Sequence, residues 1–227
     1  MTWVINNLGL IWSRSVDHVA IAFPAVILSF LIALPIGWLA TRFAWSRGIL
    51  LSLSSVLYAI PSLPLFIVLP LLIGTGLRDP INLVVALTLY GIALMVRSTA
   101  DGLSSVDGDI VQSATALGYS AWSRFWRVEL PLAGPVLLAG IRVVSVSTVS
   151  LTTVGAVLGI SGTGVFFTDG VQRNIPEEIL TGVVVTIVIA VVFDLVIVQV
   201  GRLLLPWTRA MKTARARQLR DREGVTA

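Results

Sequence analysis

The sequence predicts an all-α integral membrane protein with about five core transmembrane helices. Of its 227 residues, 56% are hydrophobic and only 12% are charged, whereas a soluble domain usually carries about a quarter charged residues. The apolar residues also gather into long runs. A helix needs about 20 apolar residues to cross a hydrocarbon core of roughly 30 Å, and five runs reach that length. We therefore expect a single transmembrane domain over residues 1–227.

Each apolar run is bounded by polar residues. The second run is interrupted by Pro61 and Pro64, which lack a backbone N–H. Broken helices at membrane depth are tolerated where they line a cavity, so this break favours either a pathway wall or a kink that only shapes packing. Residues 1–18 could add an interfacial N-terminal helix, and the basic tail 203–227 is expected in solvent or against anionic lipid. The predicted spans are about 19–41, 48–73, 81–97, 132–158 and 179–203.

Charge indicates how the spans are oriented. With the N-terminus outside, twelve of the 16 basic residues fall on the cytoplasmic side, three fall outside, and Arg142 lies within the fourth span. Cytoplasmic loops of membrane proteins carry such an excess of Lys and Arg. We therefore expect the polar connection 98–131 and the C-terminal tail to face the cytoplasm.

Several function classes are excluded by what the sequence lacks. It has no cysteine and one histidine, His18, which excludes disulfides, thiol catalysis and a multi-histidine metal site. The basic residues flank apolar runs, so the high pI of about 10.3 predicts membrane orientation rather than binding to nucleic acid. No Gly-x4-Gly-Lys-Ser/Thr loop is present to hold ATP phosphates. The chain is therefore not expected to be an enzyme or to bind a cofactor.

The connection between the third and fourth spans is predicted to form two short helices separated by a glycine. Residues 109–117 suit the first helix, with Asp109 as N-cap and Gly118 as its end. Residues 120–127 suit the second, with Ser120 as its cap. Such a compact protrusion could fit a groove on a partner protein, or it could pack only on its own bundle.

Two charges lie inside predicted spans. Arg142 is about 15 Å from the cytoplasmic start of the fourth span, and Asp194 is about 12 Å from the cytoplasmic end of the fifth, at 1.5 Å per helical residue. Charges inside a membrane are costly and usually paired, so we expect these two to form an ion pair. A direct role in binding solute is the alternative.

The solute path has weaker candidates. Tyr58 and Tyr90 could present aromatic faces to a cation, next to the break at Pro61. The fourth span is rich in hydroxyl groups, and Ser145 and Thr152 lie on one of its faces. These hydroxyl groups could line a polar path, or they could serve close packing between helices.

The loop between the third and fourth spans resembles the EAA motif of ATP-binding-cassette importer permeases, E-A-A-x3-G-x9-I-x-L-P. In that family, the motif forms coupling helices that seat in a cleft of the ATPase subunit. Here Gln112 replaces the glutamate and Ser113 the first alanine, so docking is expected to rest more on shape than on charge. The positions that carry the resemblance are Gln112, Ser113, Ala114, Gly118, Val128, Leu130 and Pro131.

Other positions resemble the osmoprotectant branch of these permeases. That branch imports glycine betaine, choline, carnitine or related quaternary amines across the bacterial plasma membrane, with a fold of the methionine-importer type. The resemblance implies a separate ATPase that binds ATP and Mg, a second permease subunit, identical or similar, and an extracytoplasmic binding protein. The positions are His18, Leu34–Gly37, Ile60–Leu63, Gly74–Gly76, Leu89-Tyr90, Gly140–Arg142, Gly159–Gly164 and Asp194.

Three other functions are compatible with a multi-span membrane protein. An importer permease for another small solute, such as an amino acid or a sulfonate, would share the same motif. An ion-coupled secondary transporter would need coupling-ion sites and usually internal repeats, and the sequence shows neither. A membrane scaffold without transport activity is a third alternative.

Overall fold

The computed structural model describes residues 2–207, and within that range the chain is helical without strands. Four helices are long and apolar enough to cross a membrane, or five if a sharply bent pair counts as one span, in agreement with the predicted fold class. The predicted tail 203–227 lies mostly outside the described residues. The helices are α1 (Thr2–Asn6), α2 (Leu8–Arg42), α3 (Ala44–Ala59), α4 (Ser62–Ile73), α5 (Pro80–Ser104), α6 (Gly108–Ala116), α7 (Ala121–Arg124), α8 (Leu130–Thr152), α9 (Val165–Gln172) and α10 (Pro176–Leu204).

The first and third spans are longer than the hydropathy predicts. Helix α2 begins at Leu8 rather than near residue 19, so most of the expected N-terminal segment continues the first span. Helix α5 runs on to Ser104 instead of ending near residue 97. Its polar last turns stay helical because they pack on α2: a Cβ added at Gly37 would lie 2.5 Å from the Thr99 side chain.

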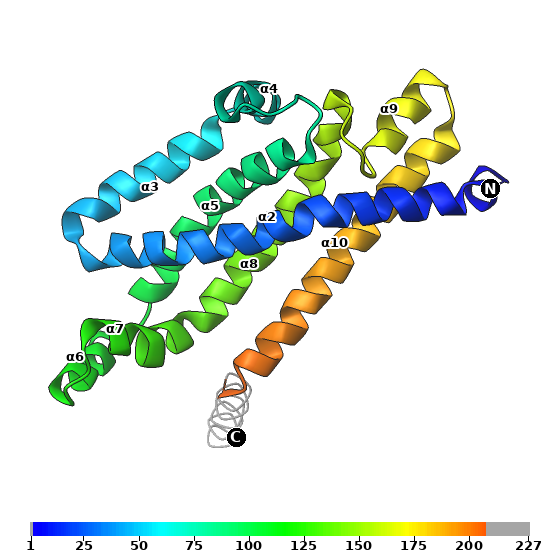
Figure 1. The fold of residues 1–227 in the computed structure, drawn as a ribbon. Helices are drawn as coiled ribbons and strands as arrows, with labels where there is room; N and C mark the ends of the chain where they lie inside the picture. The colour runs from blue at the N-terminus through cyan, green and yellow to red at the C-terminus, as the bar shows by residue number, and fades with distance from the viewer. Residues whose placement is uncertain (1, 208–227) are drawn as a thin grey trace, which may run out of the picture.

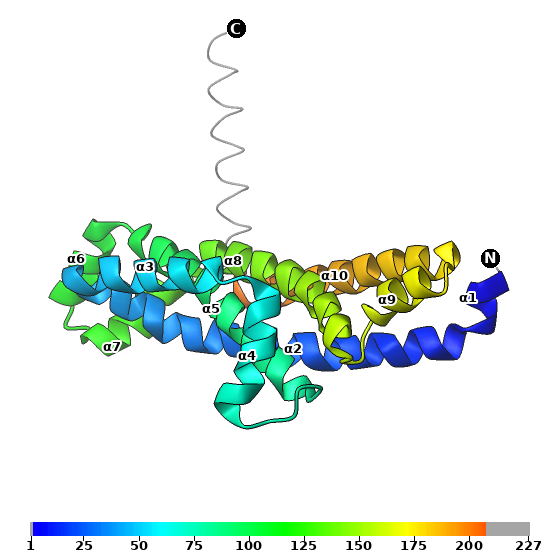
Figure 2. The same ribbon diagram turned by 90° about the horizontal axis from the view of Figure 1, so that it is seen from above.

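The second span is broken more sharply than a kink. Helices α3 and α4 meet at an angle of 102°, and in Figure 2 α4 projects out of the layer formed by the other helices. Ile60 is extended, as expected for a residue that precedes a proline. Pro61 therefore marks the break, whereas Pro64 lies in the first turn of α4, where a missing N–H removes no helical bond.

The fourth span is part of a longer continuous helix. A π-helical turn, η1 (Phe125–Glu129), joins α7 to α8, and a 3₁₀ turn, η2 (Thr153–Leu158), extends α8 at its other end. Helix α8 starts at Leu130, close to the predicted start near residue 132, but the sequence does not predict that the helical stretch is continuous from Ala121. Pro131 does not end it, because it lies at the start of α8, directly after the wider turn.

The core of the fold lies around α5. In the most apolar part of α5, 61% of the residues are buried, against 6% in α10. Small residues let the helices approach: a Cβ added at Gly140 of α8 would lie 2.6 Å from the Ser98 Cβ of α5. Figure 1 shows α6 and α7 gathered at one end of the molecule and α9 at the other.

Candidate functional site

The α6–α7 module, residues 107–129, forms one end of the molecule, and its first helix begins with an aspartate cap. The cap is Asp107 and not Asp109 as predicted: its Oδ1 accepts a hydrogen bond from the Asp109 N–H at 2.8 Å. Asp107 keeps extended backbone angles outside the helix, as an N-cap must. Asp109 lies in the first turn, where its charge favours the positive end of the helix dipole.

Gly118 ends α6, as predicted. Its φ of 86° is left-handed, a conformation that glycine adopts without steric cost. The Gly118 N–H donates to the Thr115 carbonyl at 3.0 Å, and the Tyr119 N–H donates to the Ala114 carbonyl at 3.1 Å. This pair of bonds is a Schellman motif, which satisfies carbonyls at a helix end. The glycine therefore fixes the angle between the two halves of the module.

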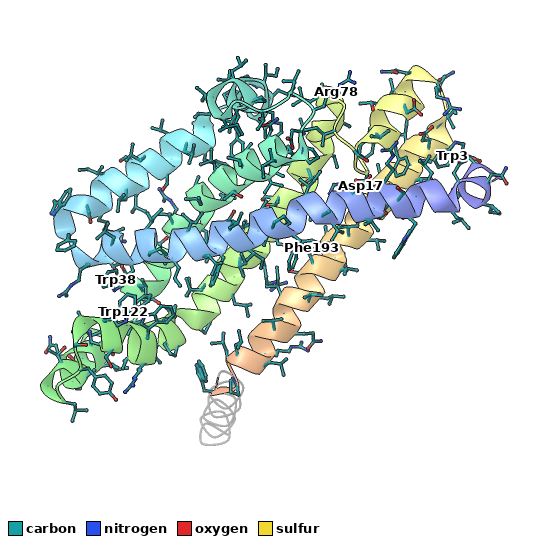
Figure 3. All side chains as sticks on the ribbon, in the orientation of Figure 1. Trp3, Asp17, Trp38, Arg78, Trp122 and Phe193 are labelled. Atoms are coloured by element: carbon teal, nitrogen blue, oxygen red, sulfur yellow. The ribbon has the colours of Figure 1, made fainter. Side chains whose placement is uncertain are left out.

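The second half of the module begins at its predicted cap and is anchored to α2 by aromatic rings. Ser120 Oγ accepts from the Ser123 N–H at 3.3 Å. Phe125 is buried, and its ring lies 5.6 Å from that of Trp38 on α2. The Trp122 ring lies 6.2 Å from the same tryptophan, and both labelled side chains are visible at this end in Figure 3. These contacts hold the module against the span.

The residues of the predicted motif divide by exposure. Gln112, Ser113 and Gly118 are exposed, and the neighbouring Leu117 is 79% exposed to solvent. Ala114 is buried against the rest of the module. The remaining motif residues, Val128, Leu130 and Pro131, are half-buried at the root of α8. The structure therefore brings the first part of the motif to an open surface and the last part to the start of a span.

One ion pair in this module is missing from the sequence-based prediction. Arg124 Nε donates to Glu129 Oε1 at 2.6 Å, and Arg124 Nη1 donates to Thr115 Oγ1 at 2.7 Å. A search for charges three or four residues apart on an α-helix passes over this pair, because its members are five apart. The contact therefore links α6 to the turn that leads into α8.

The two intramembrane charges come together in the structure. Arg142 Nε lies 2.6 Å from Asp194 Oδ1, and Nη2 lies 2.9 Å from Oδ2. This two-bonded geometry is the favoured one for a guanidinium and a carboxylate. It ties α8 to α10, in which few residues are buried.

The candidate path residues fall into two groups. Tyr58 is exposed and Tyr90 is buried, with their rings 6.0 Å apart. The Tyr90 hydroxyl donates to the Ile60 carbonyl, next to the exposed Pro61. Three of the five candidates, Tyr58, Tyr90 and Pro61, therefore meet at the break between α3 and α4.

The other two candidates, Ser145 and Thr152, are buried within α8. Ser145 Oγ has no hydrogen-bond partner among the described residues, and the Thr152 hydroxyl donates to the Thr148 carbonyl of its own helix at 2.7 Å. Neither side chain is open to a path in this conformation.

A polar cluster at the α9 end is also missing from the sequence-based site. His18 is fully buried, and its Nε2 lies 3.0 Å from the Val149 carbonyl. Since a carbonyl only accepts, Nε2 carries the proton and Nδ1 accepts from Thr163, whose Oγ1 is 2.9 Å away. Thr163 Oγ1 also lies 2.9 Å from Thr186 Oγ1. His18 and Thr163 thus join α2, α8, α10 and the loop before α9.

Further contacts hold the same loop. Ser161 donates to Asp17 and accepts from Arg14 Nη1 at 2.5 Å. The resemblance pointed to His18 and to the glycines of Gly159–Gly164, but the contacts between α2 and this loop could be seen only in the fold. Over the described residues, no group of three histidine, cysteine, aspartate or glutamate side chains could hold a metal ion.

Solved structures with a similar fold come from ABC transporters. One chain of the inward-facing MetNI methionine ABC transporter superposes with a TM-score of 0.78 at 19% identity, covering 86% of this chain and 96% of that one. A chain of an amino acid ABC transporter gives a TM-score of 0.68 at 16% identity, covering 90% of this chain and 97% of the other. At these identities the likeness shows the fold alone.

Sequence relatives give the family. The chain is 28% identical to the glycine betaine/carnitine/choline transport system permease protein OpuCB of Bacillus subtilis, over 91% of this chain and 94% of that protein. It is 30% identical to the choline transport system permease protein OpuBB of the same organism, over 88% and 91%. It is also 30% identical to the osmoprotectant import permease protein OsmW of Salmonella typhimurium, over 85% and 90%. A family model described as binding-protein-dependent transport system inner membrane component matches residues 19–210. The chain therefore belongs to the family of inner membrane components of binding-protein-dependent transport systems.

Proposed function

We propose that this chain is the permease subunit of an ATP-binding-cassette importer that carries quaternary-ammonium osmoprotectants, such as glycine betaine, choline or carnitine, into the cytoplasm. Relatives named for these solutes align with it over at least 85% of its length. The branch-typical positions His18 and Gly159–Gly164 support the same assignment, since they meet in one polar cluster.

The proposal includes an orientation and a set of partners. With the N-terminus outside, the α6–α7 module faces the cytoplasm together with twelve basic residues. A separate ATPase then binds the module and holds ATP and Mg, while a binding protein delivers solute to the α9 end. A second permease subunit, identical or similar, completes the transmembrane pair, with membrane lipid around it. No nucleic-acid partner is expected.

In this reading the α6–α7 module carries the motion of the ATPase to the spans. Its open surface holds Gln112, Ser113 and Leu117, which would seat in the ATPase cleft. The glutamine carries no charge, so the fit depends on shape and on the angle fixed at Gly118. Closure of the ATPase dimer on ATP would push the module, and α8 would tilt with it, because the helix is continuous from Ala121.

The solute path is proposed to pass the break between α3 and α4. Tyr58 and Pro61 are exposed there, and the ring of Tyr58 is an aromatic face that can attract a quaternary ammonium. The Tyr90 ring packs against that of Tyr58 in an edge-to-face contact. The hydroxyls of Ser145 and Thr152 would reach the path only when α8 moves against its neighbours. The Arg142–Asp194 pair is proposed as a tie between α8 and α10 rather than a solute ligand.

One observation carries the proposal: an exposed helix–glycine–helix module continues without a break into a membrane-spanning helix. The test reconstitutes the chain with a candidate partner ATPase and binding protein, and measures uptake of labelled glycine betaine, choline and carnitine into proteoliposomes. Uptake should require ATP and should stop when residues 112–118 are replaced, although the chain still inserts into the membrane. Uptake unchanged by that replacement would refute the coupling role, and uptake of methionine without any quaternary amine would refute the substrate class.

A further inference from the structure

Arg124 makes two strong contacts in opposite directions. Its side chain is only 14% exposed, and that of Glu129 is 13% exposed, so water screens their ion pair less than it screens a surface pair. The other end of the guanidinium reaches Thr115 on α6 at 2.7 Å. The Thr115 hydroxyl donates to the Val111 carbonyl at 2.8 Å, which leaves its lone pairs free to accept from Arg124.

The π-helical turn explains how Arg124 and Glu129 meet. On an α-helix, residues five apart point roughly 140° away from each other, since each residue turns by about 100°. In η1 the Leu130 N–H instead bonds to the Phe125 carbonyl, five residues back. This wider turn brings residue 129 round to the side of residue 124. The ion pair therefore depends on the π-helical turn and helps to stabilise it.

We propose that Arg124 is a positioning residue that locks helix α6 to the root of α8 through the π-helical turn, so that a push on α6 moves α8. This inference rests on the proposed function, because it concerns how ATPase motion reaches the spans. Without the lock, α6 is held only by the Gly118 turn and by its packing. The ATPase would then still bind and hydrolyse ATP. Part of its motion, however, would shift α6 relative to α8 instead of tilting α8.

The first test separates coupling from docking. In the reconstituted complex, Thr115→Val removes the acceptor on α6 and keeps its shape, while Arg124→Ala removes the whole lock. Both variants should keep ATPase binding and hydrolysis, while solute imported per ATP falls about fivefold or more, the usual lower range of coupling between sites. The double variant should be no worse than Arg124→Ala alone, since both changes break one connection.

Three outcomes would contradict the proposed role of Arg124. The first is a wild-type ratio of solute imported per ATP in Thr115→Val, and the second is a loss in the double variant equal to the sum of the two single losses. The third is loss of ATPase binding in either single variant. Failure of the wild-type complex to import solute with ATP would instead refute the proposed function.

The second test needs no transport. The chain has no cysteine, so spin labels can be placed at Ile110→Cys on α6 and Val136→Cys on α8, two exposed positions. The distance distribution between the labels should be narrow in the otherwise wild-type permease and clearly broader with Arg124→Ala. Equal widths would show that α6 is fixed without Arg124, whatever solute the protein carries.

Discussion

The two ends of the molecule are held together by different kinds of hydrogen bond. Within the α6–α7 module, side-chain hydrogen bonds join residues at most nine positions apart, as between Arg124 and Thr115. At the α9 end, several of them join residues more than 130 positions apart, as between His18 and Val149 or between Arg14 and Ser161. The module is therefore a local unit that can move as one body. The α9 end can open only if hydrogen bonds between separate helices break.

This difference suits the two ends to different tasks in an importer. A unit that receives a push needs internal rigidity, which the caps and the Arg124 contacts provide. Under the proposed orientation solute arrives at the α9 end, and the contacts that Thr163 makes with α2 and α10 would keep this end closed. Substitutions at the two ends should therefore differ in their effect on stability.

The largest loss of stability is expected at Gly164, beside the polar cluster. A Cβ added there would lie 2.7 Å from the carbonyl carbon of Thr153 and would also clash with its oxygen. Backbone atoms cannot rotate away as a side chain does, so we expect Gly164→Ala to lower the free energy of unfolding by about 3 kcal/mol. The measurement is thermal unfolding of the purified protein in detergent.

Gly76→Ala is the matched control for that change. It is also a loop position, and a Cβ built there meets no atom within 4 Å. Its melting temperature should stay close to that of the wild type. If Gly164→Ala has the same melting temperature as the control, Gly164 does not pack directly against the Thr153 backbone.

A smaller loss is expected when the polar cluster loses one hydroxyl. Thr163→Val keeps the shape of a fully buried side chain but removes its bonds to His18 and Thr186. We expect a cost of about 1–2 kcal/mol, typical of a buried group left without its partner, again read from thermal unfolding. Thr168→Val is the control, because that hydroxyl bonds only within its own turn, to Val165. Equal stability of the two variants would show that the cluster does not hold the helices together.

The same contrast explains which features the sequence could predict. Hydropathy indicated the spans, and local residue types indicated Gly118 and the Ser120 cap, because these depend on neighbours in the chain. The depth of Arg142 and Asp194 in their spans is also a local quantity, which is why pairing could be expected. The contacts of His18 depend on how α2 packs against α8 and against the loop before α9, so the sequence could indicate the position of His18 but not its partners.

The π-helical turn was missed for another reason. With the α-helical period, Arg124 and Glu129 do not face each other, so the sequence does not predict their contact. Pro131 lies in the first turn of α8, and the helix runs through it because a wider turn precedes it. A search for opposite charges five residues apart, just before a proline, would have pointed to this turn.

A loss of stability similar to that at Thr163, about 1–2 kcal/mol, is expected at Gly118. In Gly118→Ala the added methyl group meets no atom within 4 Å, but φ of 86° is unfavourable for alanine. Gly108→Ala, at the start of the same helix, should instead be neutral or slightly stabilising, since alanine favours helix and the position is open. Uptake should nevertheless fall in Gly118→Ala and not in Gly108→Ala, because the strain changes the angle at which α6 meets its partner. Equal uptake in the two variants would mean that this angle does not matter for coupling. The structural difference between the α6–α7 module and the α9 end would then not explain how the importer works.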